Sequence, residues 1–351
     1  MNQKRKLRGR GVLFSSVAGA LCVALTSVGV GASGANTLAA KSAVRTVFGV
    51  VEPGIFPFYA PFPGAVAAAA KRFNIVPVPK ISAPESYDQA LENAVVNSFV
   101  AEGVTGIAIQ PVDVGGSNIT IRKLVKAGIN VVAYASCDET KIGGAKVCIE
   151  ASLYADAYDA TVKLIGLMHQ KGNIVELAPN LAGSVANPRI QGVAAAIKLY
   201  PHVHLLELIA NTDSPTLAPP AVASLLAAHK NQINGVVATA DNPSDAWAKA
   251  MENENDKSIP SILTDVDPTI VTAVAKGYAS GTMASNAYGQ AYLSVYSLKL
   301  LSEGCHYTGP FVFNIPYIFV GKAAISTIYS SLAATATKIG NTWKSRYWAC
   351  K

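Results

Sequence analysis

Short apolar runs alternate along this chain with longer segments whose apolar residues recur at helical spacing. Residues 104–136 show the pattern most clearly. They contain an apolar run at 106–109, apolar positions at helical spacing after Ser117, a break at Gly128 and a β-branched run at 129–132. A strand, a helix and a second strand of these lengths are typical of a crossover between parallel strands. The stretch therefore predicts a βαβ unit in a sheet that is covered on both faces.

The same alternation continues on both sides of this unit. Further strands are expected at residues 46–51, 75–81, 147–149, 173–177, 203–208, 235–239, 261–264 and 282–285. Helices are expected at residues 64–73, 85–101, 153–169, 185–199, 217–229 and 244–253, and from residue 286 onward. Ten or so strands that alternate with helices predict the α/β fold class.

Ligands in parallel sheets collect beyond the carboxyl ends of the strands. Residues 110–116 and 135–139 are expected there, which makes Gln110 a candidate ligand contact. Asp113 has two interpretations, as a contact to the ligand or as a cap of the following helix, and capping is the favoured one. Ser117 is the other candidate for the cap.

Residues 52–63 form a loop that is rich in proline and in aromatic residues. Its aromatic side chains are too numerous for a loop surrounded by solvent. Aromatic faces bind the C–H faces of sugars as well as flat apolar ligands. We expect two of the four to face a ligand cleft and the rest to fill the core. The four are Phe56, Phe58, Tyr59 and Phe62, of which the first three are the candidates for the cleft.

The N-terminal segment has the layout of a secretory signal peptide. Five basic residues precede an apolar stretch at 12–30, and small residues follow it. We expect a signal peptide over residues 1–35, cleaved after Ala32 or Ala35, and an exported protein at the cell surface or in the periplasm. A retained membrane anchor is the alternative.

The charge and the cysteines restrict the function further. The net charge is +7, but removal of residues 1–35 leaves 24 basic and 22 acidic residues, so nothing favours a nucleic-acid partner.

Four cysteines remain after residue 35, and an even number in an exported protein predicts disulfides. Four cysteines permit three pairings. Cys137 and Cys148 flank one short loop, so we expect them to pair, and Cys305 is then left to tether the tail through Cys350. No CxxC pair or histidine cluster predicts a metal site.

The 104–136 unit resembles the periplasmic binding proteins of the ribose-binding type, the solute receptors of bacterial ABC importers. The matching features are Gln110, Pro111 and Asp113 after the first strand, and the turn at 127–129 into the second. Later segments carry the resemblance further and in the same order. They are VVATADN at 236–242, LTDVDP at 263–268 and NAYGQAYL at 286–293.

The resemblance spans roughly residues 47–320, and it implies two Rossmann-like lobes with parallel sheets joined by a multi-strand hinge. The first lobe would comprise residues 36–150 and 286–313. The second lobe and the tail would comprise residues 151–285 and 314–351. The resemblance also implies a monomer without a cofactor that delivers its solute to an ABC permease.

The site implied by the resemblance departs from that of sugar-binding relatives. Ala135 and Ser136 stand where those relatives have an Asp–Arg pair, and Asn187 stands at a second arginine, with Arg189 two residues later. Neutral donors would then hold the ligand, together with two acidic positions whose alternative role is helix capping. The donors are Gln110, Ser136, Asn187 and Asn286, and the acidic residues are Asp241 and Asp265.

This departure predicts the class of ligand. Anions are disfavoured, because the two carboxylates have no facing arginine pair. A small neutral sugar or polyol is expected. A small neutral aromatic or another non-sugar solute is the first alternative, and a secreted enzyme of unknown chemistry is the second. The chain has no GxSxG, P-loop or HExxH motif to support catalysis, so no catalytic residue is predicted.

Overall fold

The computed structural model describes residues 46–137, 142–181 and 184–351. The predicted signal peptide lies outside them. The strands are β1 (Phe48–Val51), β2 (Lys80–Ser82), β3 (Gly106–Ile109), β4 (Asn130–Tyr134), β5 (Cys148–Glu150), β6 (Gly172–Leu177), β7 (Val203–Ile209), β8 (Gly235–Ala238), β9 (Ser261–Thr264), β10 (Gly281–Ala284), β11 (His306–Tyr307), β12 (Val312–Asn314), β13 (Ile318–Gly321) and β14 (Trp348–Ala349). The helices are α1 (Phe62–Arg72), α2 (Gln89–Ala101), α3 (Val114–Lys126), α4 (Leu153–Leu167), α5 (Ala186–Ile197), α6 (Ala218–His229), α7 (Asp241–Asn253), α8 (Pro268–Lys276), α9 (Ala287–Ser302) and α10 (Ile328–Tyr347), with short 3₁₀ turns η1 (Pro57–Tyr59), η2 (Lys230–Gln232) and η3 (Ile325–Thr327).

Two six-stranded sheets carry the fold, and both have the same internal order. The first runs β12-β5-β4-β3-β1-β2 and the second runs β13-β10-β9-β8-β6-β7. Within each sheet the first five strands in chain order are parallel and are arranged 2-1-3-4-5, which is a doubly wound topology. The α/β class and the two Rossmann-like lobes are therefore confirmed. The sixth strand differs, since β12 runs parallel to β5 whereas β13 runs antiparallel to β10.

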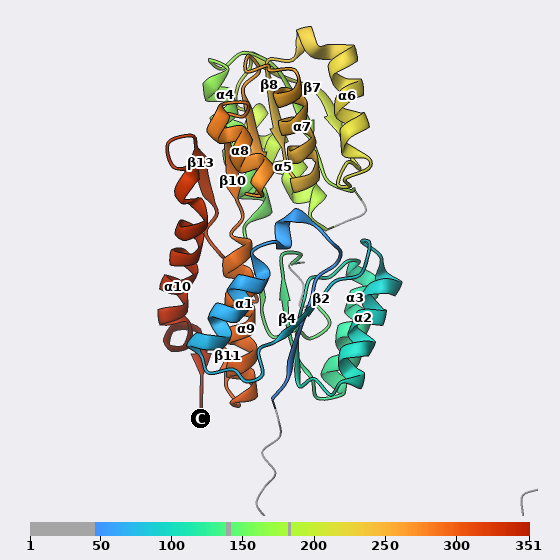
Figure 1. Cartoon of the computed structure of the whole chain (residues 1–351), viewed down its shortest axis with the longest axis vertical. Helices are drawn as coiled ribbons and strands as arrows, with labels where there is room; N and C mark the ends of the chain where they lie inside the picture. The colour runs from blue at the N-terminus through green and yellow to red at the C-terminus, as the bar shows by residue number, and fades with distance from the viewer. Residues whose placement is uncertain (1–45, 138–141, 182–183) are drawn as a thin grey trace, which may run out of the picture. The chain divides into compact units, whose positions relative to one another are not determined.

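The first sheet is apolar on both faces because alternate side chains point to opposite sides. In β3, Ala108 packs into the core formed with α1 and α9, whereas Ile107 and Ile109 pack into the core beneath α2 and α3. In Figure 1, β2 and β4 accordingly lie between α1 and α9 on one side and α2 and α3 on the other. This double cover explains the continuous apolar runs that predicted these strands.

The second sheet repeats the arrangement. Val236 of β8 packs into the core with α6, α7 and α8, and Val237 packs into the core with α4 and α5. Glu176 is an exception to the apolar pattern, since it lies in β6 with only 1% of its surface exposed. Its described partner is the Thr239 hydroxyl, which donates to Oε1 at 3.4 Å.

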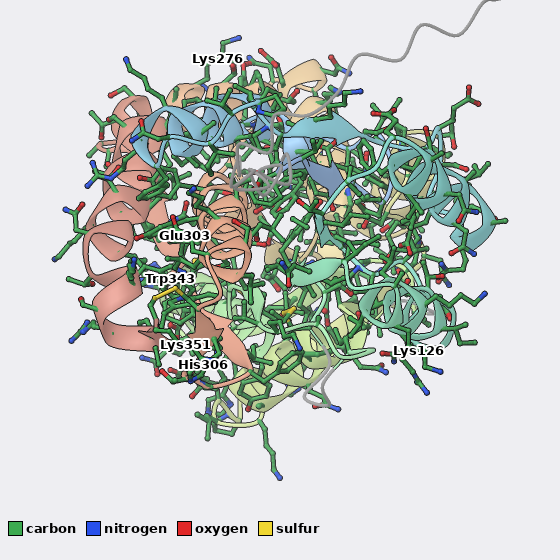
Figure 2. All side chains as sticks on the ribbon, turned by 90° about the horizontal axis from the view of Figure 1, so that it is seen from below. Lys126, Lys276, Glu303, His306, Trp343 and Lys351 are labelled. Atoms are coloured by element: carbon green, nitrogen blue, oxygen red, sulfur yellow. A yellow bond between two sulfur atoms is a disulfide. The ribbon has the colours of Figure 1, made fainter. Side chains whose placement is uncertain are left out.

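Three connections join the two lobes. The chain passes between the sheets from β5 to α4, from β10 to α9 and from β12 to β13. The domain boundaries predicted from the sequence stay a proposal, and α10 complicates the tail. Leu332 at its start packs in the core of the second lobe, whereas Ala336 and Trp343 pack in the core of the first. Figure 2 shows Trp343 inside the protein, with Lys126 and Lys276 at its periphery.

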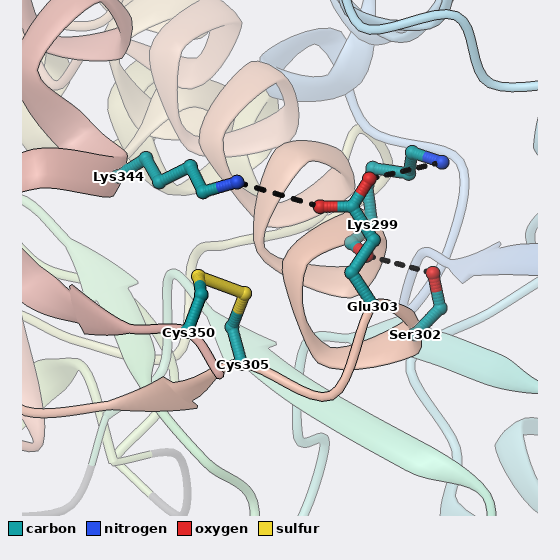
Figure 3. Close-up of a disulfide and its surroundings, with 6 residues drawn as sticks. All are labelled: Lys299, Ser302, Glu303, Cys305, Lys344 and Cys350. Atoms are coloured by element: carbon teal, nitrogen blue, oxygen red, sulfur yellow. Dashed lines mark hydrogen bonds and ion pairs between the residues drawn. A yellow bond between two sulfur atoms is a disulfide. The ribbon is translucent and has the colours of Figure 1, made fainter.

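Two disulfides close loops on the first lobe. Cys137 and Cys148 are bonded with their Cα atoms 5.8 Å apart, and Cys305 and Cys350 with theirs 4.2 Å apart. Both pairings agree with the predicted ones. Figure 3 shows that the second disulfide links the loop after α9 to the end of the chain, near Glu303, whose carboxylate pairs with Lys299 at 3.2 Å.

The structure shows which of the candidate acidic and hydroxyl side chains cap helices. The Asp113 side chain accepts from the Gly116 amide at 2.5 Å, so capping is confirmed, and Ser117 is buried inside α3 instead. Asp267, and not Asp265, caps α8 by accepting from Thr269 at 2.7 Å. Asp265 therefore has no capping role to explain it.

The strand predicted at 75–81 is shorter than expected. Only Lys80–Ser82 pairs with β1. Pro77 and Pro79 lack an N–H group to donate within a sheet, and Val76 is 82% exposed, so this apolar run does not extend the strand. In the part of the chain described here, no helix is both long and apolar enough to span a membrane.

Candidate functional site

A cavity lies between the two lobes, at the carboxyl ends of both sheets. It encloses about 660 Å³ of space, including the part that is open to solvent. Its lining residues follow the ends of eight parallel strands, which is where ligands bind in sheets of this topology. The first lobe contributes Phe56, Phe58, Tyr59, Tyr87, Gln110 and Ala135, and the second contributes Asn180, Val185, Arg189, Asp213, Ala240, Asp241 and Asp265.

An aromatic wall covers the side of the cavity formed by the first lobe. Pro57 opens the turn η1, which places Phe56, Phe58 and Tyr59 around the cavity, and Tyr87 joins them from the loop after β2. The rings support one another edge to face. Phe56 lies 6.0 Å from Tyr87 and Phe58 lies 5.0 Å from Tyr59, measured between ring centroids. This packing fixes a rigid apolar surface before any ligand arrives.

Gln110 is the neutral hydrogen-bonding group of this wall. It follows β3 directly, and its backbone amide donates to the Val51 carbonyl at 3.3 Å. The Tyr59 hydroxyl donates to its side-chain oxygen Oε1. Because this contact fixes the orientation of the side-chain amide, the NH₂ group is the end that remains to donate to another group.

Three carboxylates form the opposite side of the cavity. Asp241 begins α7, and its Oδ1 accepts from the Asn242 amide at 2.9 Å. Asp213 follows β7 and accepts from the Asn242 side chain at 2.9 Å. Asp265 follows β9 with a left-handed backbone, at φ of +72°, and accepts from the Ser285 amide at 3.4 Å. Asn242 therefore holds two of the three acids in place.

Burial sets the electrostatics of these acids. Burial raises the pKa of Asp241 well above its ordinary value, and the nearby Asp213 and Asp265 carboxylates raise it further. Burial also raises the pKa of Asp265, although Arg189 opposes that effect. The Arg189 guanidinium comes from α5 and is the only cation among the described residues that line the cavity.

The two sides of the cavity contact each other. The Phe58 amide donates to Oδ2 of Asp241 at 3.2 Å, which links the aromatic loop to the second lobe. At a second crossing point, the hydroxyls of Ser136 and Ser184 are hydrogen-bonded to each other. These bonds bridge the lobes directly, so the structure represents an arrangement in which they are closed on each other.

The cavity contains donors, acceptors and aromatic faces, but no apparatus for a metal. Among the described residues, no group of three or more histidine, cysteine or acidic side chains is arranged to hold a metal ion.

A comparison with known families agrees with this geometry. Residues 53–305 match the periplasmic binding protein domain. The match covers more than half of the sequence. The chain belongs to this family.

Solved structures of ABC transporter solute-binding proteins share the fold of the chain at low sequence identity. One is an ABC transporter solute-binding protein from Burkholderia graminis in complex with D-arabinose, with a TM-score of 0.74, 18% identity, and coverage of 82% of this chain and 99% of that one. A second, from Actinobacillus succinogenes with bound D-allose, has a TM-score of 0.73, 18% identity and coverage of 81% and 100%. A third, from Bacillus halodurans with bound myo-inositol, has a TM-score of 0.71, 18% identity and coverage of 83% and 99%.

Six of the nine predicted ligand residues line the cavity of this binding protein. They are Phe56, Phe58, Tyr59, Gln110, Asp241 and Asp265. All three candidate aromatics contribute, where two were expected to face the cleft, and Phe62 is fully buried in the core. Their role in binding stays a prediction, but the structure brings them to one place.

The other three predicted residues lie elsewhere. Ser136 is buried against Ser184, and Asn187 is exposed on α5, where Arg189 lines the cavity in its place. Asn286 caps α9 by accepting from Gly289 at 2.9 Å, and it lines a neighbouring cavity. Residues 187 and 189 lie two apart on α5, and at about 100° per residue their side chains point to nearly opposite sides of the helix.

Sequence reasoning missed Tyr87, Asn180 and Asp213. Each follows a strand by a few residues, as the recognised residues do. The signal that could have found them is the general one that ligands collect at the carboxyl ends of parallel strands, which points to the loops after β2, β6 and β7 as much as to those of the 104–136 unit.

Proposed function

We propose that this protein is the extracytoplasmic solute receptor of an ABC importer, that it binds a small sugar or polyol between its lobes, and that it presents the closed form to a membrane permease. The observation that carries the proposal is the cavity itself. It gathers an aromatic wall and a set of hydrogen-bonding side chains from the carboxyl ends of both sheets. The related structures with bound arabinose, allose and inositol support a ligand of this class.

The two sides of the cavity suit the two kinds of surface on such a ligand. A buried hydroxyl without a partner costs about 1–3 kcal/mol, so a polyol needs many donors and acceptors. Carboxylates such as Asp241 and Asp265 accept strongly from hydroxyls. Phe56 and Phe58 offer faces for the C–H surface of a ring. Neither side would suffice alone.

Closure of the lobes provides the link to transport. The Phe58 amide and the Asp241 carboxylate meet only if the lobes come together, because they belong to different lobes. A ligand that touches both sides favours that state, and hinge closure requires no chemistry. We therefore propose a receptor that is not an enzyme.

A thermal-shift and calorimetric panel tests the proposal. It contains neutral sugars, polyols, sugar acids and small aromatics. At about 100 times its dissociation constant, a ligand stabilises the protein by about 2.7 kcal/mol. We expect stabilisation by sugars or polyols and none by sugar acids. Stabilisation by aromatics alone, or turnover of any compound in the panel, would contradict the proposal.

A further inference from the structure

The cavity has an excess of negative groups. Asp213, Asp241 and Asp265 line it, and Arg189 is the only cation among its described lining residues. Asp241 and Asp265 are 6% and 7% exposed, so water screens them poorly. A neutral polyol brings no positive charge to match these acids.

Arg189 does not balance the acids evenly. Burial raises the pKa of Glu150 and of Asp156 to about 7, and Arg189 acts against burial at both of them, as it does at Asp265. The positive charge of its guanidinium thus favours the ionised form of Asp265 and of two buried carboxyls that do not line the cavity, Glu150 and Asp156. The groups that act on Asp241 are its burial, Asp213, Asp265 and the Phe58 amide, and Arg189 is not among its principal influences. The Asp213–Asp241 end of the cavity therefore has no cation of its own.

The aromatic wall faces this same end. The Phe58 amide is bonded to Asp241. Burial raises the pKa of Tyr87, and the next largest cause is the nearby Asp213 carboxylate. Burial likewise raises the pKa of Tyr59, with Asp241 among the smaller causes. Two carboxylates thus share one end of the cavity with several ring faces.

Carboxylates beside aromatic faces form a binding site for an ammonium group. A desolvated cation over a ring face is attracted by the negative face of the ring, and a charge-assisted hydrogen bond to a carboxylate is about twice as strong as a neutral one. A hydroxyl in the same place gains neither ring attraction nor charge compensation. The cavity itself establishes the site, and the distribution of charge selects what occupies it.

We propose that the preferred ligand is a sugar or cyclitol that carries a protonated amine, with the ammonium group between the Asp213 and Asp241 carboxylates and the rings of Phe56, Phe58 and Tyr87. The inference rests on the proposed function, and it narrows the expected class from neutral polyols to cationic ones. Arg189, Asp265, Asn180 and Gln110 also line the cavity and are available to bind hydroxyl groups.

Binding of an ammonium group displaces a proton. In the empty receptor Asp241 retains its proton to a raised pH, because it is buried and lies close to Asp213 and Asp265. The other titratable groups that face this end are Tyr59 and Tyr87, both with raised pKa, and Glu52, whose pKa burial raises to about 7. The arriving cation stabilises the ionised carboxylate, so the proton leaves to the buffer.

Isothermal titration of the purified protein with matched sugars tests the inference. Each set contains a hexose, its 2-amino derivative and its N-acetylated 2-amino derivative, in the gluco, galacto and manno series, together with myo-inositol and an aminocyclitol. We expect at least one amine to bind at least tenfold more tightly than its neutral counterparts at pH 7. Comparison of buffers with different ionisation enthalpies should show proton release for the amine and none for the neutral sugars.

Variants separate the charge effect from a loss of structure. Asp213→Asn keeps the shape of the side chain and is expected to reduce the preference for the amine to less than threefold. Asp256→Asn removes an acid that pairs with Lys230 outside the cavity, and it should leave the preference unchanged. Unfolding midpoints of both variants check that the fold is retained.

The outcomes distinguish this inference from the proposed function. If neutral sugars or polyols bind as tightly as the amines, the inference fails and the proposed function stands. If no sugar, cyclitol or amine binds, both fail. If amines are preferred but Asp213→Asn keeps the preference, the assignment of the ammonium group to this end of the cavity is overturned.

Discussion

The two lobes have the same strand order, yet they bring opposite chemistry to the cavity. The first lobe presents four aromatic rings and the neutral Gln110, whereas the second presents three carboxylates and one guanidinium. The shared strand order thus fixes where the loops meet, and the sequence of each loop fixes the chemistry that it presents. The difference teaches that one lobe offers an apolar surface and the other offers polar groups, which is the basis of the proposed mode of ligand binding.

The two sides are also stabilised in different ways. The aromatic wall is held by ring contacts, such as the 5.0 Å separation of Phe58 and Tyr59, which remain favourable with the cavity empty. The acidic side carries an electrostatic cost, because burial disfavours the ionised form of Asp241 and Asp265. A ligand therefore gains more from the acidic side, since its binding relieves an existing cost.

The acidic side should show the largest effect on affinity. Asp241→Asn removes the carboxyl group that accepts from the Phe58 amide and that we propose pairs with the ligand, and we expect affinity to fall at least 100-fold. Because burial raises the pKa of Asp241, loss of the charge should leave the unfolding midpoint at pH 8 unchanged or higher. Calorimetry and thermal unfolding measure the two quantities.

Asp245→Asn is the matched control for that variant. Asp245 lies one turn further along α7, pairs with Lys249 at 3.3 Å and does not line the cavity. Its substitution should change affinity by less than twofold. An equal loss of affinity in both variants would show that the charge of α7, and not contact with the ligand, matters.

The aromatic side should show the next largest effect. Phe58→Ala removes a ring face from a preformed wall, and we expect affinity to fall more than tenfold with little loss of fold. Tyr154→Ala is the control, because Tyr154 is 44% exposed and lies outside the cavity. Unchanged affinity of Phe58→Ala would limit the role of this side to packing.

Loss of the disulfide between Cys137 and Cys148 should have a smaller effect on affinity. Cys137 follows Ser136, and its amide donates to Glu150 at 2.9 Å, so loss of the Cys137–Cys148 bond loosens the strand ends beside Ala135. We expect an affinity loss of about threefold on replacement of both cysteines by serine. On the chain-entropy model the stability loss is about 3 kcal/mol.

Replacement of Cys305 and Cys350 provides the comparison. This bond joins cysteines that are 45 residues apart, and the loss of so long a closed loop should lower the free energy of unfolding by about 4 kcal/mol. Neither cysteine lines the cavity. Affinity should be unchanged at a temperature where the protein is folded. Peptide mapping without reduction verifies both pairings, and free thiols at 137 and 148 would remove the basis of the prediction.

The smallest effect on affinity is expected for a buried acid outside the cavity. Burial raises the pKa of Glu176 from 4.5 to about 7. The folded state therefore keeps the proton up to about pH 7, whereas the unfolded chain loses it near pH 4.5, so this group destabilises the protein as pH rises between these values. Glu176→Gln should raise stability at pH 8 by roughly 2 to 3 kcal/mol, or about 4 °C in the midpoint.

At pH 4 the same substitution should have almost no effect, because both states then hold the proton. Affinity should change by less than twofold at either pH. A larger change in affinity would show that Glu176, although buried in β6, influences the ligand site. An equal gain in stability at both pH values would show that the effect is packing and not ionisation.

Much of the fold follows directly from the sequence. Apolar runs such as 261–264 are buried on both faces of a sheet, and that requirement leaves little choice of residue, so the strands are recognisable. Helix starts are similarly local, as Asp113 shows, because a cap and its amide lie three residues apart. The strand predicted at 75–81 is shorter because Val76 and Val78 are exposed beside Pro77 and Pro79, which have no N–H group to donate.

The candidate site was predictable only where its parts are contiguous. Phe56, Phe58 and Tyr59 lie in one loop, and their density alone indicated a ligand wall. Asp213 and Asp241 are separated along the chain and come together through β7, β8 and Asn242. No local pattern contains that proximity.

The sequence by itself determined the α/β class, the order of the elements, the disulfide candidates and the aromatic loop, since each depends on residues that are neighbours or on simple periodicity. Only the tertiary structure decided that Arg189 and not Asn187 lines the cavity, that Asn286 caps a helix, and that the acids outnumber the cations. The physical reason is that direction around a helix and long-range electrostatics depend on how separate segments pack, which periodicity does not encode.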